Sequence, residues 1–352
     1  MTRQEILDAV RARIPIKGAD LSGADLAGAD LSGCRFEKAS FRGANLAGAA
    51  IKDAGFRKCD FSGAVLDGCD LTKMDLSRTS FAGASLKGVQ TRMTLLGGSD
   101  FSGADLSGAR LYWSVADKAR FEGARLAGAT LEKLTIRESV FAKADFTGAS
   151  LVKAILSRCD MKGAVLRDVR FDKALLTGCD LSGHDFSGLT LHQVNFSGSS
   201  LKGAKFAGAR FNYCHFGKAD LEGADMTGAD GSKCMYLGAN LKTARLAGGR
   251  FGNSVFSEAD LAAADLTGAA LFKCAFKKAV CRGAKLAGCD LRHADFSHAD
   301  CTGTDFSRSD MTMANFHLIK DEHAIYDMTE RTLVRATNKD MAEAESFVPA
   351  QP

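Results

Sequence analysis

Apolar residues recur at every fifth position of this chain from Leu21 to Phe316, with no residue inserted or deleted between them. Only Thr91 and Gly231 of these 60 central positions are not apolar, counting Ala, Tyr and Cys as apolar. The position two residues before each centre is Ala in 34 of the 60 repeats. The position two residues after it holds 31 of the 37 glycines, and the residue just before the centre is most often Asp.

A period of five matches neither a helix, which repeats at 3.6, nor a long strand, which repeats at 2. It matches a short extended piece followed by a corner. The small and central residues lie two apart and share the inner face, while the residue between them points outward. Glycine after the centre suits the corner. The pattern predicts a solenoid whose coils stack as parallel strands.

The large aromatic residues indicate how many repeats make one coil. They recur every 20 residues in two series, Phe41, Phe61, Phe81, Phe101, Phe121 and Phe141, and then Phe196, Phe216, Tyr236, Phe256, Phe276, Phe296 and Phe316. Like residues stack in neighbouring coils of a solenoid, so one coil holds four repeats. We expect an all-β, four-sided parallel β-helix of 15 coils, about 70 Å long at roughly 4.8 Å per coil. Right-handed winding is expected, as for parallel crossovers in general.

Repeats such as Ala24-Asp25-Leu26-Ala27-Gly28 and Ala44-Asn45-Leu46-Ala47-Gly48 resemble the A(D/N)LxG units of the pentapeptide-repeat family. The resemblance covers about 85% of the chain. It implies a right-handed quadrilateral β-helix, which agrees with the periodicity, and a mostly non-enzymatic role.

Both ends depart from the repeat. Residues 2–13 predict a helix with a Thr2–Glu5 capping box, and residues 1–15 would form the lid of a β-helix over 16–318. The repeat register is expected to fail after Phe316, with helical pieces around 322–335 and 339–347. Residues 319–352 would then form a helical cap, or a dimerisation element, which the resemblance allows. The apolar anchors would be Ile325, Leu333, Val334, Met341 and Phe347.

Composition sets the compartment and the redox state. The net charge is +4, no run of 18 apolar residues exists, and the N-terminus lacks a signal-peptide core. A cytoplasmic protein is expected, with export by a specialised secretion system left open. All 11 cysteines occupy inward positions, so buried free thiols are expected, although pairs one coil apart leave a disulfide open. They are Cys34, Cys59, Cys69, Cys159, Cys179, Cys214, Cys234, Cys274, Cys281, Cys289 and Cys301.

Sorting the outward positions by 20 gives four faces. One is acidic, two are mixed or polar, and the fourth carries large apolar residues beside an aromatic corner. An apolar, aromatic-rimmed stripe predicts a protein contact, although β-favourable residues on a strand would give the same pattern. The candidate interface is Leu95, Tyr112, Trp113, Val115, Ile155, Leu175, Tyr213, Met235, Val255 and Phe272.

No catalytic set is evident. The chain has no Ser/His/Asp combination, phosphate loop or HExxH motif, so neither an enzyme nor a cofactor is expected. His184 occupies an inner position and is interpreted as a core histidine. His293 and His298 with Asp295 and Asp300 are interpreted as solvated surface rather than a metal site, and no metal site is expected.

Three functions follow. The first is a rigid scaffold that presents flat faces to a protein partner, with self-association open. The second, from the resemblance, is a DNA mimic that modulates DNA gyrase; the acidic face favours it, and the slightly basic net charge opposes it. The third, also from resemblance, is a bacterial secretion-system accessory protein. Direct nucleic-acid binding is not expected, because basic and acidic residues alternate.

Overall fold

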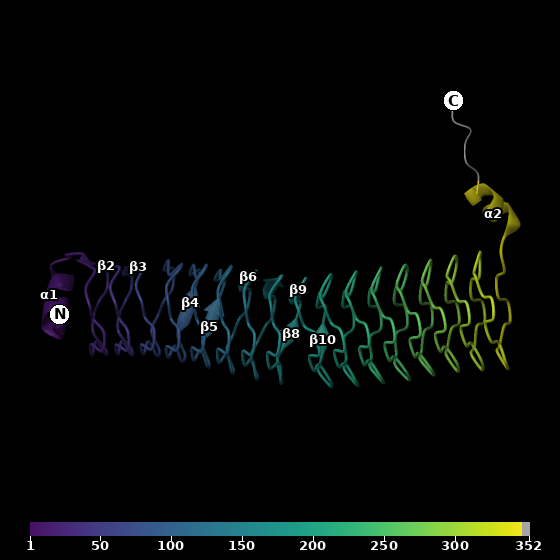
Figure 1. Cartoon of the computed structure of the whole chain (residues 1–352), viewed down its shortest axis with the longest axis horizontal. Coiled ribbons are helices and arrows are strands. Elements are labelled where there is room, and N and C mark those ends of the chain that lie inside the picture. The colour runs from purple at the N-terminus through teal and green to yellow at the C-terminus, as the bar shows by residue number, and fades with distance from the viewer. Residues whose placement is uncertain (347–352) are drawn as a thin grey trace, which may run out of the picture. The chain divides into compact units, whose positions relative to one another are not determined.

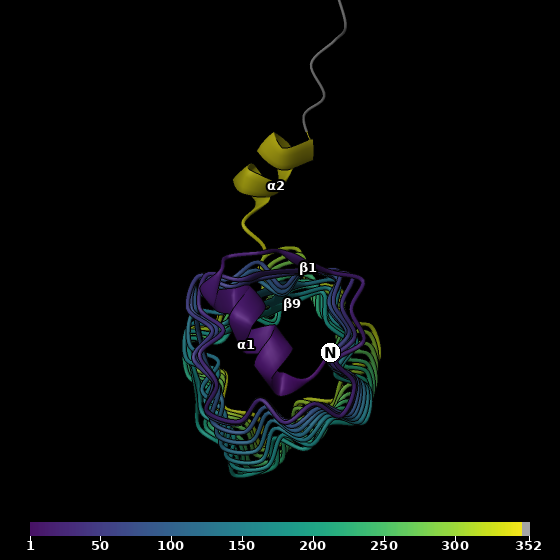
Figure 2. The same cartoon turned by 90° about the vertical axis from the view of Figure 1, so that its left-hand side faces the viewer.

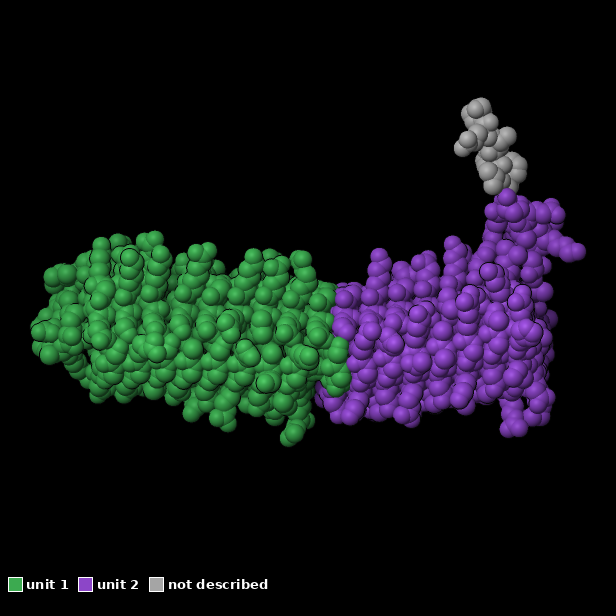
Figure 3. All heavy atoms as spheres, in the orientation of Figure 1, with its two compact units in different colours: residues 1–184 green, residues 185–352 purple. Residues whose placement is uncertain are grey.

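The computed structural model describes residues 1–346, which form two compact units. Unit 1 comprises Met1–His184, and unit 2 begins at Asp185 (Figure 3). Each unit is described by itself below. No helix within residues 1–346 has the length and apolar character needed to cross a membrane.

Each unit is a stack of coils joined by parallel bridges between residues 20 apart (Figure 1). In unit 1 the series runs from Asp20↔Ser40 to Asp160↔Asp180, and in unit 2 from Asp185↔Lys205 to Asn315↔Arg335. A turn follows every extended residue pair, so four repeats close one coil. The parallel, four-sided β-helix and its 20-residue coil are therefore confirmed.

Most extended pieces are too short to count as strands, and the longer ones pair in the same register. β1, β2 and β3 form one sheet, β4 pairs with β5, and β6, β7 and β9 form another. Phe36 of β2, for example, lies between Ile16 and Phe56. The strands are β1 (Ile16–Lys17), β2 (Arg35–Glu37), β3 (Gly55–Arg57), β4 (Gln90–Arg92), β5 (Arg110–Tyr112), β6 (Thr135–Arg137), β7 (Ile155–Ser157), β8 (Phe171–Asp172), β9 (Leu175–Thr177) and β10 (Leu191–His192).

The corners explain the glycines and aspartates of the repeat. The second residue after each centre adopts a left-handed backbone, as at Gly23 with φ of 67°, a conformation that glycine reaches without a side-chain clash. The outward aspartate accepts a hydrogen bond from the backbone N–H two residues on, as Asp20 does from Ser22 at 3.0 Å. Each Asp therefore closes a turn, which accounts for its recurrence without any chemical role.

The core of each unit contains stacked aromatic rings. In unit 1 the Phe41 and Phe61 rings are 4.7 Å apart and nearly parallel, and the stacking continues to Phe141. In unit 2 the Tyr236 and Phe256 rings are 4.5 Å apart at 3°. The two predicted aromatic series are thus confirmed as columns within their units.

Inward cysteines, serines and threonines share one hydrogen-bonding pattern. Their side chains donate to the backbone carbonyl 23 residues earlier, as Thr94 Oγ1 does to Leu71 at 2.7 Å and Cys274 Sγ to Phe251 at 3.0 Å. All 11 cysteines are buried and free. The thiols are therefore polar partners for the backbone of the preceding coil as well as small apolar fillers. His184 is also buried, so its coil holds the imidazole inside.

The prediction that Gly231 leaves a central position empty is wrong. A Cβ at Gly231 would lie 2.3 Å from Cε2 of Phe211, so the Phe211 ring already occupies that space. The ring of Phe251, from the following coil, lies 6.5 Å from that of Phe211. The polar centre Thr91 is also satisfied, since its hydroxyl lies 3.0 Å from that of Ser114.

The N-terminal helix α1 (Arg3–Arg11) crosses the mouth of the first coil (Figure 2). The predicted capping box is confirmed, because Thr2 accepts from the Glu5 backbone while Glu5 accepts from the Thr2 backbone. Ile6 is fully buried, and the Arg3 guanidinium donates to the carbonyls of Asp25 and Ala27 at 3.3 and 3.2 Å. The helix is thereby fixed to the coil edge.

The prediction that the repeat ends at Phe316 is wrong. Residues 317–336 form one more coil, whose bridges run from Asp300↔Lys320 to Asn315↔Arg335, so no helix forms over 322–335. Tyr326 stacks on Phe306 with 5.4 Å between ring centroids, as a central residue should. The second expected helix is confirmed as α2 (Lys339–Ser346), while Phe347 lies outside the described residues.

Candidate functional site

The fourth face of unit 1 is a continuous column of outward residues. Parallel bridges join Leu95 to Val115, Val115 to Thr135, Thr135 to Ile155 and Ile155 to Leu175. Leu95 is 47% exposed, and the other four are partly exposed. The structure thus brings together the predicted apolar residues of unit 1 over five consecutive coils.

Tyr112 and Trp113 flank this column at a corner and are surrounded by cations. Their rings stack at 5.0 Å, and Lys133 donates a 3.0 Å hydrogen bond to the Tyr112 hydroxyl. The Lys133 ammonium lies 4.8 Å from the centroid of the Trp113 ring, and the Arg92 guanidinium lies 5.6 Å from it. Arg92 comes from the preceding coil and Lys133 from the following one. We call Arg92, Tyr112, Trp113 and Lys133 the aromatic–cation cluster.

The backbone at Trp113 is unusual for so large a side chain. Trp113 has a φ of 53° and stands at the corner position that glycine occupies in most repeats. A left-handed conformation costs a non-glycine residue roughly 1–2 kcal/mol. The Trp113 ring is nevertheless 43% exposed, so core packing repays little of that cost.

Unit 2 repeats the arrangement more sparsely. Met235 and Val255 form neighbouring bridges of one column. The Lys233 ammonium donates a 3.0 Å hydrogen bond to the Tyr213 hydroxyl, which raises the pKa of Lys233. The ring of Phe272 lies within 5.1 Å of the Lys273 ammonium and within 5.6 Å of the Arg292 guanidinium. Tyr213 and Phe272 therefore each have a cation against the ring, as in unit 1.

The cations are the part of this surface that sorting by outward position missed. Arg92, Lys133 and Lys233 occupy corner positions, which the sequence reading assigned to turns. The signal that would reveal them is the same 20-residue spacing applied to corners, because Trp113 and Lys133 are 20 apart and so are Tyr213 and Lys233.

The acidic face has a different character from the one predicted for it. Carboxylates in its column are paired with a cation 18 residues earlier, at a corner of the preceding coil. The pairs, with their N···O distances, are Arg42–Asp60 (3.2 Å), Lys202–Asp220 (3.3 Å), Lys242–Asp260 (3.1 Å) and Arg282–Asp300 (2.7 Å). The hydrogen bond from Arg282 lowers the pKa of Asp300 to about 2, against the opposing effect of partial burial. Much of the negative charge of this face is thus locally compensated.

The C-terminal candidates lie on the last coil and on α2. Ile325 is 51% exposed and Leu333 69% exposed, Val334 is partly exposed on the inner side of the last coil, and Met341 on α2 is exposed. Phe347 lies outside the described residues. Dimerisation at this end stays a prediction.

Comparison with family models supports the repeat assignment. The model for pentapeptide repeats matches in eight copies that together cover more than half of the chain, and the model for a pentapeptide repeat region matches one further segment. The matched segments are residues 19–57, 59–90, 94–132, 124–163, 238–277 and 274–312 for the first model and 151–226 for the second. A search of curated proteins finds no match.

Several solved structures are similar. HetL, a pentapeptide repeat protein involved in heterocyst differentiation regulation in the cyanobacterium Nostoc sp. strain PCC 7120, is 25% identical, covering 86% of this chain and 96% of its own, with a TM-score of 0.25. QnrB1, a plasmid-mediated fluoroquinolone resistance protein, is 23% identical over 45% of this chain and 84% of its own, with a TM-score of 0.19. A thylakoid-lumen pentapeptide repeat protein from Arabidopsis thaliana is 23% identical over 30% of this chain and 74% of its own, with a TM-score of 0.24.

Proposed function

Because this chain belongs to the pentapeptide-repeat family, we propose that it is a non-enzymatic scaffold that binds a protein partner through the fourth face of unit 1. Outward side chains on a stack of hydrogen-bonded coils are held at fixed spacings. The partner therefore meets an ordered surface and loses little further entropy in ordering it.

One observation carries the proposal, the exposed Trp113 at a left-handed corner. Trp, Tyr and Arg are the residue types enriched among the dominant contacts of protein interfaces. Trp113 is exposed in spite of a backbone conformation that favours glycine. Strain of this kind persists where it serves a function.

The composition of the surface indicates the chemistry of the partner. The column of Leu95, Val115, Ile155 and Leu175 offers an apolar strip, and Arg92 and Lys133 add two positive charges beside the rings. A protein surface with exposed apolar residues and neighbouring carboxylates would complement it. Partner carboxylates would also be drawn to cations that are already held against the rings.

The DNA-mimic alternative is the weaker proposal. A mimic of DNA should present uncompensated negative charge, whereas Asp60, Asp220, Asp260 and Asp300 each have a cation within 3.3 Å. QnrB1 is named as a fluoroquinolone resistance protein, but its similarity to this chain is one of fold. We expect no effect of this chain on the supercoiling activity of DNA gyrase.

The test is the substitution Trp113→Gly. Glycine relieves roughly 1–2 kcal/mol of backbone strain, and the lost cation–π contacts are worth about 0.5–1 kcal/mol each at exposed sites. The stability of the fold should therefore change by no more than about 1 kcal/mol while the contact surface is lost.

The matched control is Lys153→Gly, because Lys153 occupies an equivalent corner with a φ of 56° and has no aromatic ring. The tagged full-length chain and both variants are used to capture proteins from a lysate of the source organism, and captured proteins are quantified by mass spectrometry. A partner retained by the parent and by Lys153→Gly but lost by Trp113→Gly is the expected result. Equal capture by all three proteins would refute the proposed surface.

A further inference from the structure

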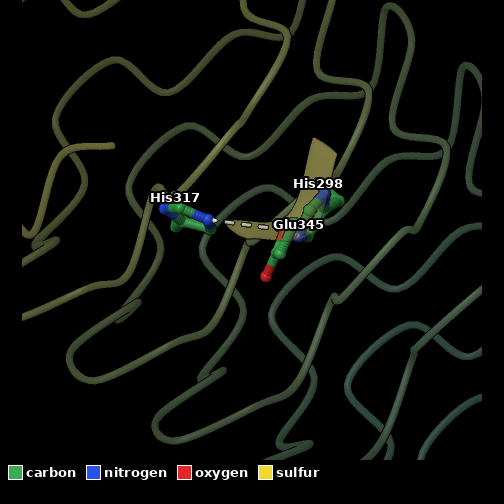
Figure 4. Close-up of side chains that lie close together, drawn as sticks. All are labelled: His298, His317 and Glu345. Atoms are coloured by element: carbon green, nitrogen blue, oxygen red, sulfur yellow. Dashed lines mark ion pairs between the residues drawn. The ribbon is translucent and has the colours of Figure 1, made fainter. Parts of the chain in front are cut away.

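Three metal-ligating side chains converge where α2 returns to the last coils of unit 2 (Figure 4). His298 and His317 stand at successive corners of the repeat, and Glu345 comes from α2. Oε2 of Glu345 lies 3.0 Å from Nε2 of His298 and 3.7 Å from Nε2 of His317. The three ligand atoms all lie within 4.8 Å of one another.

His317 is the member that a solvated surface does not explain. Its side chain is only 6% exposed, and Nε2 has no hydrogen-bond partner among the described residues. Figure 4 shows its imidazole directed at Glu345. A buried polar atom without a hydrogen bond is uncommon in folded proteins and points to a ligand that the protein chain does not itself supply.

We propose that His298, His317 and Glu345 bind a transition-metal ion of the Zn²⁺ type. Two imidazoles and one carboxylate are a common three-ligand set for zinc, with a fourth position left to water. Bonds of about 2.0–2.2 Å in a tetrahedral site place ligand atoms roughly 3.3 Å apart. The observed separations of 3.0 and 3.7 Å bracket that value, so small side-chain movements complete the site.

The surroundings restrict the class of metal. A cavity of about 470 Å³ adjoins the cluster and is lined by Lys277, Arg335 and Asp295 among others. Asp295 already accepts hydrogen bonds from Ser297 and Asn315, so it is not free to serve as a further ligand. Two nearby cations and a single available carboxylate disfavour Mg²⁺ and Ca²⁺, which require several oxygen ligands. Imidazole ligands instead suit Zn²⁺, Cu²⁺ and Ni²⁺.

Metal binding would also change one hydrogen bond. The backbone N–H of Asn338 donates to Nδ1 of His317 at 3.2 Å, so the proton of a neutral imidazole sits on Nε2 in the metal-free form. Coordination through Nε2 transfers that proton to Nδ1 and displaces the Asn338 amide. Asn338 lies directly before α2, and its side chain accepts from the backbone N–H of Met341. Coordination is therefore linked to the start of α2 as well as to Glu345, and the ion would hold α2 against the last coil.

The experiment is titration of the full-length chain with Zn²⁺ by isothermal calorimetry, in parallel with Co²⁺ followed by visible absorption. The variants are His298→Gln and Glu345→Gln, both at partly or fully exposed positions. The control is His323→Gln, an exposed histidine of the last coil outside the cluster. Circular dichroism confirms that each variant is folded.

We expect one Zn²⁺ per chain, with affinity at least tenfold weaker in His298→Gln and Glu345→Gln and unchanged in His323→Gln. The Co²⁺ complex should show the intense visible bands of a four-coordinate site without a thiolate charge-transfer band, since the cysteines are buried elsewhere. Absence of binding, equal affinity in Glu345→Gln, or thiolate absorption in the Co²⁺ complex would each overturn the proposal.

Discussion

The packing around Gly231 yields a sharp stability prediction, for the substitution Gly231→Ala. A new Cβ would meet Cε2 of Phe211 at 2.3 Å, and Cδ2 and Cζ of the same ring at 3.0 Å. The ring cannot withdraw easily, because it is fully buried and packs against Phe206 at 5.4 Å and Phe216 at 5.7 Å between ring centroids. A single methyl group must therefore displace an aromatic ring within a close-packed core.

The expected magnitude follows from two opposing effects. Overpacking a well-packed core costs typically about 1–3 kcal/mol. Replacing glycine by alanine at a compatible backbone conformation stabilises by about 0.4–1 kcal/mol through the unfolded chain. Gly231 does not adopt a left-handed backbone, so the second effect applies in full. We expect a net destabilisation of roughly 1–2 kcal/mol.

The assay is urea unfolding combined with amide hydrogen exchange over residues 206–235, because coils of a solenoid can unfold locally. The control is Gly252→Ala, where the nearest atom to a new Cβ is the Phe272 carbonyl oxygen at 3.6 Å. It should be neutral or stabilising. In Phe211→Leu with Gly231→Ala, the smaller side chain should recover part of the loss. If Gly231→Ala proves as stable as Gly252→Ala, the proposed exchange of volume between Gly231 and Phe211 is wrong.

Two further predictions concern an end of the solenoid and its turns. Deleting residues 1–14 removes the buried Ile6 and uncovers the first coil, so aggregation or loss of amide protection in that coil is expected by sedimentation and hydrogen exchange; a soluble truncation of equal stability would contradict the lid. Hydrogen bonds from neighbouring hydroxyl and amide groups lower the pKa of Asp145, Asp225 and Asp265 below 3.8. Their contribution to stability is present above about pH 4 and is lost as the pH falls through the lowered values. Melting temperatures should therefore drop between pH 5 and pH 2.5, by less in Asp145→Asn, and an unchanged melting temperature over that range would refute the turn contribution.

The periodic part of the structure could be predicted because every repeat reports the same geometry. The 20-residue coil, the inward cysteines and the columns of outward residues follow from spacing alone, and they hold within each unit. The capping box at Thr2 and Glu5 was equally legible, because it depends only on local sequence.

The last coil was missed because its central residues break the apolar rule. Asp321 and Arg331 stand where Leu or Phe would be expected, yet Lys320, Ile325, Glu330 and Arg335 still pair with the preceding coil. Backbone pairing with a preformed edge is enough to form this coil, since each new strand extends hydrogen bonds already in place. A terminal coil covers only one neighbour and needs less apolar volume.

The compensating pair of Gly231 and Phe211, and the cluster of His298, His317 and Glu345, were missed for a different reason. Both depend on how side chains 20 or more residues apart lean toward one another. The histidines were considered with aspartates nearby in sequence, whereas the ligand atom that meets them comes from α2. Which residue α2 directs at the coil depends on where the last coil ends, and that was predicted one coil too early.

The bridges between residues 20 apart also restrict how such a sequence can change in length. Within either unit, removing five residues would rotate every later side chain by one face, so that Leu95 and Val115 would no longer share a column. Removing 20 would shorten the stack by one layer and leave each remaining face in place. Gains and losses among descendants of this gene should therefore come in whole layers, and the number of layers sets the length of any partner that reads one face from end to end.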